Sequence, residues 1–495
     1  MKRIALMILM MLLLSACIPT PEQAFVVNKG DNIAEEKINE TPGTDANAQT
    51  GVGRQTFPDR WDEEPIAESA HLVVRAHADI RTKADGLYPV YRTREAEITA
   101  ETVKNIAVKF LDRPTSSSES LMTKEDYGRQ LQHFLDERAR YEEWVKAGKP
   151  DDWSNVDEYE WTPEEIERET NWYMERIKNA PDSLTSQAVN DYSGLQQNIT
   201  MAFTLASGGV ASICYSNDND FYVITKGCRD FPNLYSVYSY QDDLEWKEGR
   251  YALWLEPGIS YEDAKNICLS EAERLGFAGF SIAGSYEATL FESKSPNTAI
   301  TGGWCFGLKR DFDGYPLLAS HVYATQNLEY GSGDGYMFNK KIPLERLFLF
   351  VSKDGLQMIR YDAPKDVSGL VNANVKLLPF DEIKGRIANA LLSCFPYEKI
   401  AACTVERDEN SPRLELEIYD VTLSTFTLYV KDSTDYYEMP CWIVSYDCCD
   451  PVRGEADWEM HKSLWAQELN DPGTSHDTLI INAVDGSIVR PDHGY

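Results

Sequence analysis

This chain contains five Asp-Gly dipeptides, and they constrain its fold more than any other feature. Asp-Gly tolerates positive φ at both central positions of a type I′ turn, so it is a strong signal for a β-hairpin. Four of the five stand between runs that alternate or are rich in β-forming residues. The sequence therefore predicts antiparallel hairpins around Asp85-Gly86, Asp313-Gly314, Asp354-Gly355 and Asp485-Gly486, while Asp334-Gly335 lies outside this pattern.

Three segments between these hairpins have the pattern of helices. Each opens with a capping or acidic turn and continues with apolar residues at helical spacing. They begin near Thr99, Ser260 and Pro379. We expect an α+β fold of antiparallel hairpins with packed helices, in which this unit is repeated and the first two helices lie on one face of a sheet.

An acidic stretch departs from this plan. Residues 119–182 contain 18 acidic and 9 basic side chains, and we expect two helices there. The first presents apolar residues on one side and ends at Gly148; the second opens with Thr162-Pro163, where Thr suits the N-cap and Pro the first helical position. The stretch predicts a helical hairpin with a solvated acidic surface.

The first 17 residues have the pattern of a bacterial lipoprotein signal. Lys2 and Arg3 precede eleven apolar residues, and Leu14-Ser15-Ala16-Cys17 has the order of a lipobox. Eleven residues are too few to cross a bilayer core about 30 Å thick as a helix. We expect a mature chain that begins at a Cys17 acylated with diacylglycerol and palmitate, exported and anchored to the extracytoplasmic face of the cell membrane. An ordinary signal peptide, with Cys17 incidental, is the alternative.

The composition of the rest of the chain predicts a linker followed by folded domains. Residues 18–60 are rich in Pro, Gly, Asn, Thr and Glu, which predicts a flexible linker after the signal at 1–17. We then expect an N-terminal α/β unit with the acidic hairpin at 61–190, a central α+β domain at 191–365 and a C-terminal α+β domain at 366–495. The net charge of −32 argues against nucleic acid as a partner and leaves membrane attachment to the lipid.

Nine cysteines remain after the anchor, an odd number that cannot all pair within one chain. Export permits disulfides, and the close sequence neighbours Cys214 with Cys228 and Cys394 with Cys403 are candidates. A metal site is a weaker alternative for Cys441, Cys448 and Cys449, because there is no CxxC pair and no histidine close by. Buried thiols are the third interpretation, and we expect no metal or cofactor.

Catalytic motifs are incomplete. The sequence around Ser281 approaches a nucleophile elbow, but Ala283 replaces the second glycine. The start of a calcium loop at Asp311-Phe312-Asp313-Gly314 lacks the remaining ligand spacing. The seven histidines have no ligand spacing, and a glycosidase pair of carboxylates cannot be placed from sequence. We predict no catalytic residue, which favours a protein without enzymatic activity.

Several short sequence segments, distributed along most of the mature chain, resemble a family of uncharacterised lipoproteins of Gram-positive bacteria. This family is built from a domain of unknown function. The segments lie at 76–79, 99–101, 260–264, 312–316, 345–346, 354–355, 376–383, 439–442 and 481–487. The final hairpin is similar to PepSY-type modules, in which a helix packs on a small antiparallel sheet. The resemblance implies an α+β fold and assigns no active site.

These features predict a lipid-anchored, non-catalytic binding or regulatory module of the cell envelope, with an envelope protein, a peptide or a glycan as its partner. A cell-envelope hydrolase acting on glycan or peptide is the first alternative. A substrate-binding lipoprotein of a transporter is the second, although the chain lacks the long alternation of strands and helices that two parallel-sheet lobes require.

Overall fold

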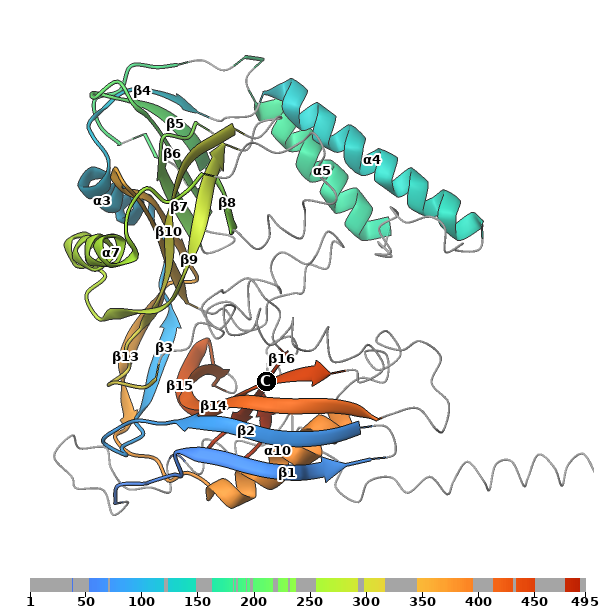
Figure 1. The fold of residues 1–495 in the computed structure, drawn as a ribbon. Coiled ribbons are helices and arrows are strands. Elements are labelled where there is room, and N and C mark those ends of the chain that lie inside the picture. Colours follow the sequence, from blue (N-terminus) through green and yellow to red (C-terminus); the bar gives the residue numbers. More distant parts are fainter. Residues whose placement is uncertain are drawn as a thin grey trace, which may run out of the picture.

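Two β-sheets with helices packed on them make up the α+β fold of the computed structural model (Figure 1). The structure describes residue 38 and residues 53–69, 72–119, 123–147, 163–180, 182–183, 186–192, 194–195, 199–216, 221–229, 232–236, 255–292, 298–316, 345–394, 413–430, 433–449 and 477–489. Within these ranges, no helix is both long and apolar enough to cross a membrane.

The first sheet has eight strands and combines the two ends of the chain. Its path runs β1-β2-β14-β15-β16-β17, and β3 pairs with both β15 and β13. β14 lies parallel to β2, while the other pairs in this sheet are antiparallel. The strands are β1 (Arg60–Glu68), β2 (Leu72–Arg81), β3 (Val90–Glu95), β13 (Lys365–Asn372), β14 (Leu414–Tyr429), β15 (Asp435–Cys449), β16 (Asp477–Asn482) and β17 (Ile488–Val489).

The second sheet has nine antiparallel strands and is inserted between β3 and β13. The chain leaves the first sheet through β3 and returns through β13, and these two strands pair with each other (Figure 1). Its order is β4 (Pro114–Glu119), β5 (Ile199–Leu205), β6 (Val210–Ser216), β7 (Phe221–Lys226), β12 (Gly355–Asp362), β11 (Arg346–Ser352), β10 (Thr298–Arg310), β9 (Phe280–Glu292) and β8 (Pro232–Ser236).

This topology corrects the predicted division into consecutive domains at 61–190, 191–365 and 366–495. The first predicted unit is split, because β1 to β3 belong to the same sheet as β13 to β17, while β4 belongs to the inserted sheet. A long-range parallel pair, with Val74 opposite Leu416, joins the two ends of the chain. Local hairpin signals carry no information on such a pair.

Of the four hairpins predicted at Asp-Gly dipeptides, the structure contains two. Asp354-Gly355 connects β11 to β12 and Asp485-Gly486 connects β16 to β17, which confirms both hairpins. The hairpin predicted around Asp85-Gly86 is wrong, because β2 pairs with β1 and β14 and β3 pairs with β13 and β15. Asp313-Gly314 is a turn after β10, but Tyr315 does not open a strand. Asp334-Gly335 lies outside the described residues.

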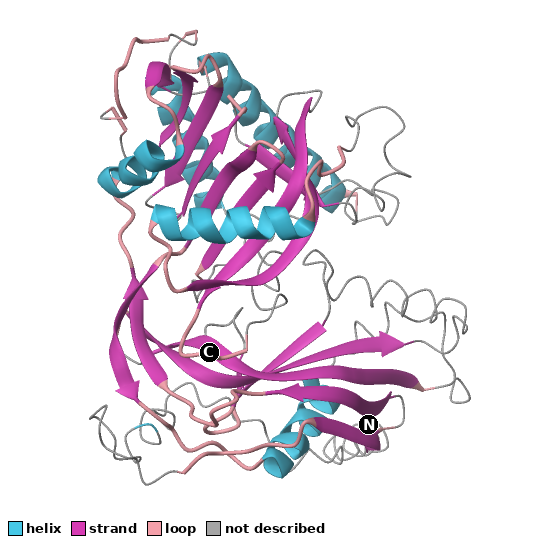
Figure 2. Ribbon diagram, turned by 60° about the vertical axis from the view of Figure 1, so that its left-hand side comes forward, coloured by secondary structure: helices cyan, strands magenta, loops and turns pink. Residues whose placement is uncertain are grey.

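Three helices lie where the sequence predicts them. Thr99 caps α3 (Ala100–Phe110) and Ser260 caps α7 (Tyr261–Leu275), in each case by accepting a backbone N–H in the first turn. Both pack their apolar sides on the nine-stranded sheet, and Figure 2 shows a helix lying across its strands. α10 (Phe380–Cys394) packs on the eight-stranded sheet.

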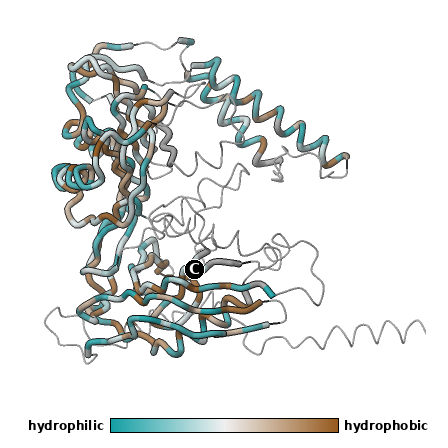
Figure 3. The backbone as a smooth tube through the Cα atoms, viewed as in Figure 1, coloured by the Kyte–Doolittle hydropathy of each residue, from teal (hydrophilic) through white to brown (hydrophobic). Residues whose placement is uncertain are grey.

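The acidic helical hairpin is also confirmed. α4 (Lys124–Lys146) and α5 (Pro163–Asn179) contact each other, and the rings of Phe134 and Tyr173 lie 6.2 Å apart. α4 ends slightly before the predicted Gly148, with Ala147 as its C-cap. The two helices project from the sheet (Figure 1), and many of their residues are hydrophilic (Figure 3).

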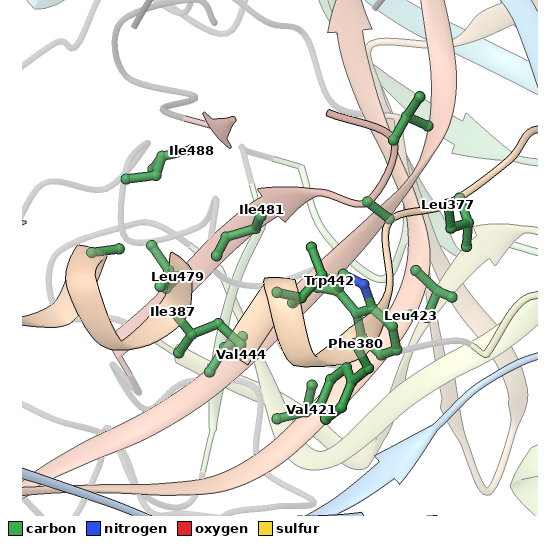
Figure 4. Close-up of a cluster of buried hydrophobic side chains, with 14 of the residues drawn as sticks. Leu377, Phe380, Ile387, Val421, Leu423, Trp442, Val444, Leu479, Ile481 and Ile488 are labelled. Carbon is green, nitrogen blue, oxygen red and sulfur yellow. The ribbon is translucent and has the colours of Figure 1, made fainter. Parts of the chain in front are cut away.

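The core of the eight-stranded sheet lies between its strands and α10. Figure 4 shows Trp442 and Phe380 against each other, and their ring centroids are 5.1 Å apart. The predicted linker at 18–60 is shorter than expected, because parts of it belong to this core. Ile38 is buried there, and the Gln55 side-chain amide donates to the Val375 carbonyl at 3.0 Å.

The backbone at Leu255 and Glu256 passes very close to Gly302 in the nine-stranded sheet. A Cβ there would lie 2.0 Å from the Leu255 carbonyl oxygen, whereas a Cβ at Gly128 in α4 meets nothing within 4 Å. We expect Gly302→Ala to lower the free energy of unfolding by at least about 2 kcal/mol, because backbone must move. Gly128→Ala should raise it by about 0.5–1 kcal/mol. Urea unfolding measures both, and equal effects would contradict the close approach.

Candidate functional site

One face of the eight-stranded sheet carries charged side chains across three neighbouring strands. In β2, Val74, Ala76, Ala78 and Ile80 are buried in the core with α10. Successive strand residues point to opposite faces, so the alternating charged residues of β2 lie on the other side. We call this side the charged face; it comprises Arg60, Asp62, Glu64, Arg75, His77, Asp79, Arg81, Glu415, Glu417 and Asp420.

The centre of the charged face is a histidine between two carboxylates. His77 Nε2 lies 2.6 Å from Glu64 Oε1, and its Nδ1 lies 3.5 Å from Glu417 Oε1. Arg75 lies beside the same Glu64 at 3.7 Å and also contacts Glu415. These contacts connect β1, β2 and β14 through side chains on one surface.

Ion pairs flank this centre on both sides. Arg60 lies 2.7 Å from Asp62 and 2.9 Å from Asp79, and Arg81 lies 2.8 Å from Asp420. The hydrogen bond and charge of Arg60 lower the pKa of Asp62. Because Arg60, Asp62 and Asp79 are exposed, their two pairs contribute little to stability.

The charged face is accessible and carries more negative than positive charge. Its side chains are between 31% exposed at Glu417 and 74% at Asp79, except for Asp420 at 11%. Six carboxylates stand against three guanidinium groups and one imidazole. In the part of the chain that the structure describes, no cluster of three His, Cys, Asp or Glu side chains could hold a metal ion. The arrangement is a surface that attracts positively charged groups.

A largely buried network of hydrogen bonds lies where the second sheet meets the first, and we call it the junction. Arg310, at the end of β10, donates two hydrogen bonds to Glu345, at 2.9 and 2.7 Å. The Tyr361 hydroxyl donates to the same carboxylate at 2.6 Å, and the Lys365 backbone N–H donates at 3.0 Å. Burial works to lower the pKa of Arg310, but the hydrogen bonds and charge of Glu345 outweigh it and raise that pKa.

Lysines continue the junction into the eight-stranded sheet. Lys365 Nζ, almost fully buried, donates to Glu438 at 3.0 Å and to the Thr427 hydroxyl at 2.6 Å. Lys309 Nζ, partly buried, donates to the Thr425 carbonyl at 3.0 Å and lies 3.3 Å from the Ser424 hydroxyl. Burial lowers the pKa of Lys309 to about 8. Lys309 therefore connects the inserted sheet to β14, whereas Lys365 connects β13 to β14 and β15 within the eight-stranded sheet.

The segment after β10 completes the junction. Its Phe312 ring lies 5.3 Å from Tyr91, and the Tyr315 hydroxyl donates to the Pro89 carbonyl at 3.0 Å. Asp311, which the sequence placed at the start of an incomplete calcium loop, accepts the Gly314 N–H at 2.7 Å and so forms a turn. This turn directs Phe312 and Tyr315 into the first core.

The candidate disulfide between Cys214 and Cys228 does not form in the structure. Gly227 N–H donates to the Val210 carbonyl, so Cys228 lies beside the start of β6, and Cys214 is four residues further along that strand. Four strand residues span about 13 Å, whereas a disulfide needs Cα atoms within about 7 Å. Each thiol has another hydrogen-bond partner, Thr200 for Cys214 and the Phe291 carbonyl for Cys228.

The remaining predicted residues are placed only in part. Cys394 ends α10, but its side chain and all of Cys403 lie outside the described residues, as do Cys17 and the side chains of Cys448 and Cys449. Cys441 is buried in an apolar cluster, and this burial raises the pKa of its thiol. Ser281 lies inside β9, paired with Lys309, and not at the strand-to-helix turn of a nucleophile elbow.

Comparisons with known proteins add little. The chain matches no family model, and no curated protein matches it. Among solved structures it is similar to the crystal structure of an uncharacterized protein from Eubacterium rectale, determined at 1.45 Å resolution. The match has a TM-score of 0.39 and 10% sequence identity, and it covers 92% of this chain and 98% of that one. A similarity this distant assigns no activity.

We expect the loss of Glu345 in the junction to lower the free energy of unfolding more than the loss of an exposed carboxylate. Glu345→Ala leaves the half-buried Arg310 without its carboxylate partner, and we expect the free energy of unfolding to fall by about 3–5 kcal/mol. Asp366→Ala, which removes an exposed partner of Arg94 at 3.6 Å, should cost less than about 1 kcal/mol. Urea unfolding of both variants measures the difference. Similar losses would show that the junction is no stronger than a surface pair.

Lys309 predicts a pH dependence of stability. Its pKa is 10.5 for the free side chain and about 8 in the folded protein, so the unfolded state holds the extra proton between these values. The free energy of unfolding should therefore rise with pH across this window through Lys309. We expect Lys309→Met to show a smaller rise between about pH 7.5 and about pH 9.5. An equal rise in urea unfolding of both proteins would contradict this assignment.

Proposed function

We propose that this protein is a lipid-anchored lipoprotein on the extracytoplasmic face of the cell membrane. The proposal is supported by Leu14-Ser15-Ala16-Cys17 at the end of a short apolar run. A diacyl anchor is sufficient for stable attachment, which a protein with a net charge of −32 needs because anionic lipid headgroups repel it. Ile38, the first residue that the structure describes, is buried in the core and comes 21 positions after Cys17.

We further propose that its activity is to bind, without catalysis, another component of the cell envelope. The observation that carries this proposal is the charged face, an exposed surface on a sheet whose opposite side is packed against α10. The junction supports it, because Lys309 of the inserted sheet hydrogen bonds to Ser424 and Thr425 of β14, a strand of the sheet that carries this surface. A rigid exposed platform loses little entropy when a partner binds.

A PepSY-like relationship belongs to the same proposal. Its support is the packing of α10 on β1, β2 and β16, with the short β16–β17 hairpin at the end of the sheet. In such an arrangement the helix occupies one sheet face and leaves the other for contacts. The envelope protein, peptide or glycan that binds there is the partner to be identified.

Crosslinking in intact cells tests the proposal. We expect wild-type protein to carry an alkyne-labelled fatty acid, to stay in the membrane fraction and to yield a specific envelope partner. Cys17→Ala should lose the label, the membrane location and the partner, whereas Cys214→Ala, a matched loss of one thiol, should keep all three. Unchanged fractionation of Cys17→Ala would refute the anchor. Release of product from cell-wall material by purified protein would refute the non-catalytic role in favour of a hydrolase.

A further inference from the structure

We infer that the charged face binds a basic segment of a partner protein in extended conformation, with lysine or arginine at alternate positions. This inference rests on the proposed binding function and specifies the chemistry of the partner. It is carried by the charge of the exposed surface and by the spacing of its carboxylates on β1 and β14, the two strands that flank β2.

Charge selects a basic occupant. Arg60 is shared between two carboxylates, and so is Arg75, which leaves the face with an excess of acid. A carboxylate has about four acceptor sites, so one that already contacts an arginine can accept hydrogen bonds from a second cation. An acidic segment would instead meet like charges, which disfavours binding.

Spacing selects an extended occupant. The strand register places Glu415 beside Val73, Glu417 beside Arg75 and Asp62 beside His77. On the two strands that flank β2, carboxylates thus recur at every second position, Glu415 and Glu417 on β14 and Asp62 and Glu64 on β1, a repeat of about 6.7 Å. Alternate side chains of an extended peptide have the same repeat, so successive lysines could each reach a carboxylate.

Access to the face is also suitable. Asp79, Glu64 and His77 are 74%, 52% and 35% exposed, and they come from two adjacent strands. A segment lying along β2 would cover all three without displacing a buried side chain. Long-range attraction by the acidic protein would speed its arrival and make binding sensitive to salt.

Fluorescence anisotropy with synthetic peptides tests the inference on the full chain purified in detergent. The probes are a Lys-Thr alternating peptide, a peptide of the same composition with its lysines in one block, and a Glu-Thr alternating peptide. We expect the alternating lysine peptide to bind tightest, the Glu-Thr peptide not to bind, and affinity to fall between about 0.05 M and about 0.5 M salt.

Matched variants locate the site. The double variant Glu64→Gln, Glu417→Gln should bind the alternating peptide about tenfold more weakly. Glu167→Gln, Glu175→Gln removes the same charge from exposed positions of α5 and should bind like wild type. Far-ultraviolet circular dichroism and thermal melting establish that both variants fold.

Three results would overturn the inference: equal affinity for the alternating and block peptides, equal effects of the two double variants, or binding of a neutral glycan at this face in place of the peptide. Its failure differs from that of the proposed function. Crosslinking in cells could still recover a partner that depends on Cys17 while the peptides do not bind. In that case the proposed binding function is retained, and only the inference of a basic, extended partner is refuted.

Discussion

Glu345 accepts hydrogen bonds where the inserted sheet meets the first one, two from Arg310 at the end of β10 and one from the backbone N–H of Lys365 in β13. The guanidinium of Arg310 is half-buried and the Glu345 carboxylate is buried, and their paired hydrogen bonds have a specific geometry that tolerates little displacement. Glu345 also accepts from Tyr361 of β12, and Lys365 in turn reaches Glu438 of β15. The network therefore links strands of both sheets.

Local features of this fold could be predicted from the sequence because their causes are local. A hydroxyl at Thr99 or Ser260 satisfies backbone N–H groups of the turn that follows, whatever surrounds the helix. Asp354-Gly355 and Asp485-Gly486 form their turns for a similar reason, since positive φ is required at the turn itself. Caps and turns thus identified elements without placing them in sheets.

The placement of elements and the candidate site depend on contacts between distant residues. β2 pairs with β14, more than 300 residues later, and this pairing brings Glu417 to His77. The alternation of charged and apolar residues from Arg75 to Arg81 was a visible signal that one side of this strand faces water, but it did not identify the neighbouring strands. No sequence pattern indicated the junction, because Arg310 and Glu345 come together only in the folded chain.

The central claim is that the junction holds both sheets in one fixed arrangement beside the charged face. Spin labels attached through non-canonical amino acids at Glu101 on α3 and Asp381 on α10 test it, because both side chains are exposed and the native cysteines stay unchanged. The account predicts a single narrow distance distribution by double electron–electron resonance, which broadens in Glu345→Ala. A broad or two-peaked distribution in the wild-type protein would contradict it.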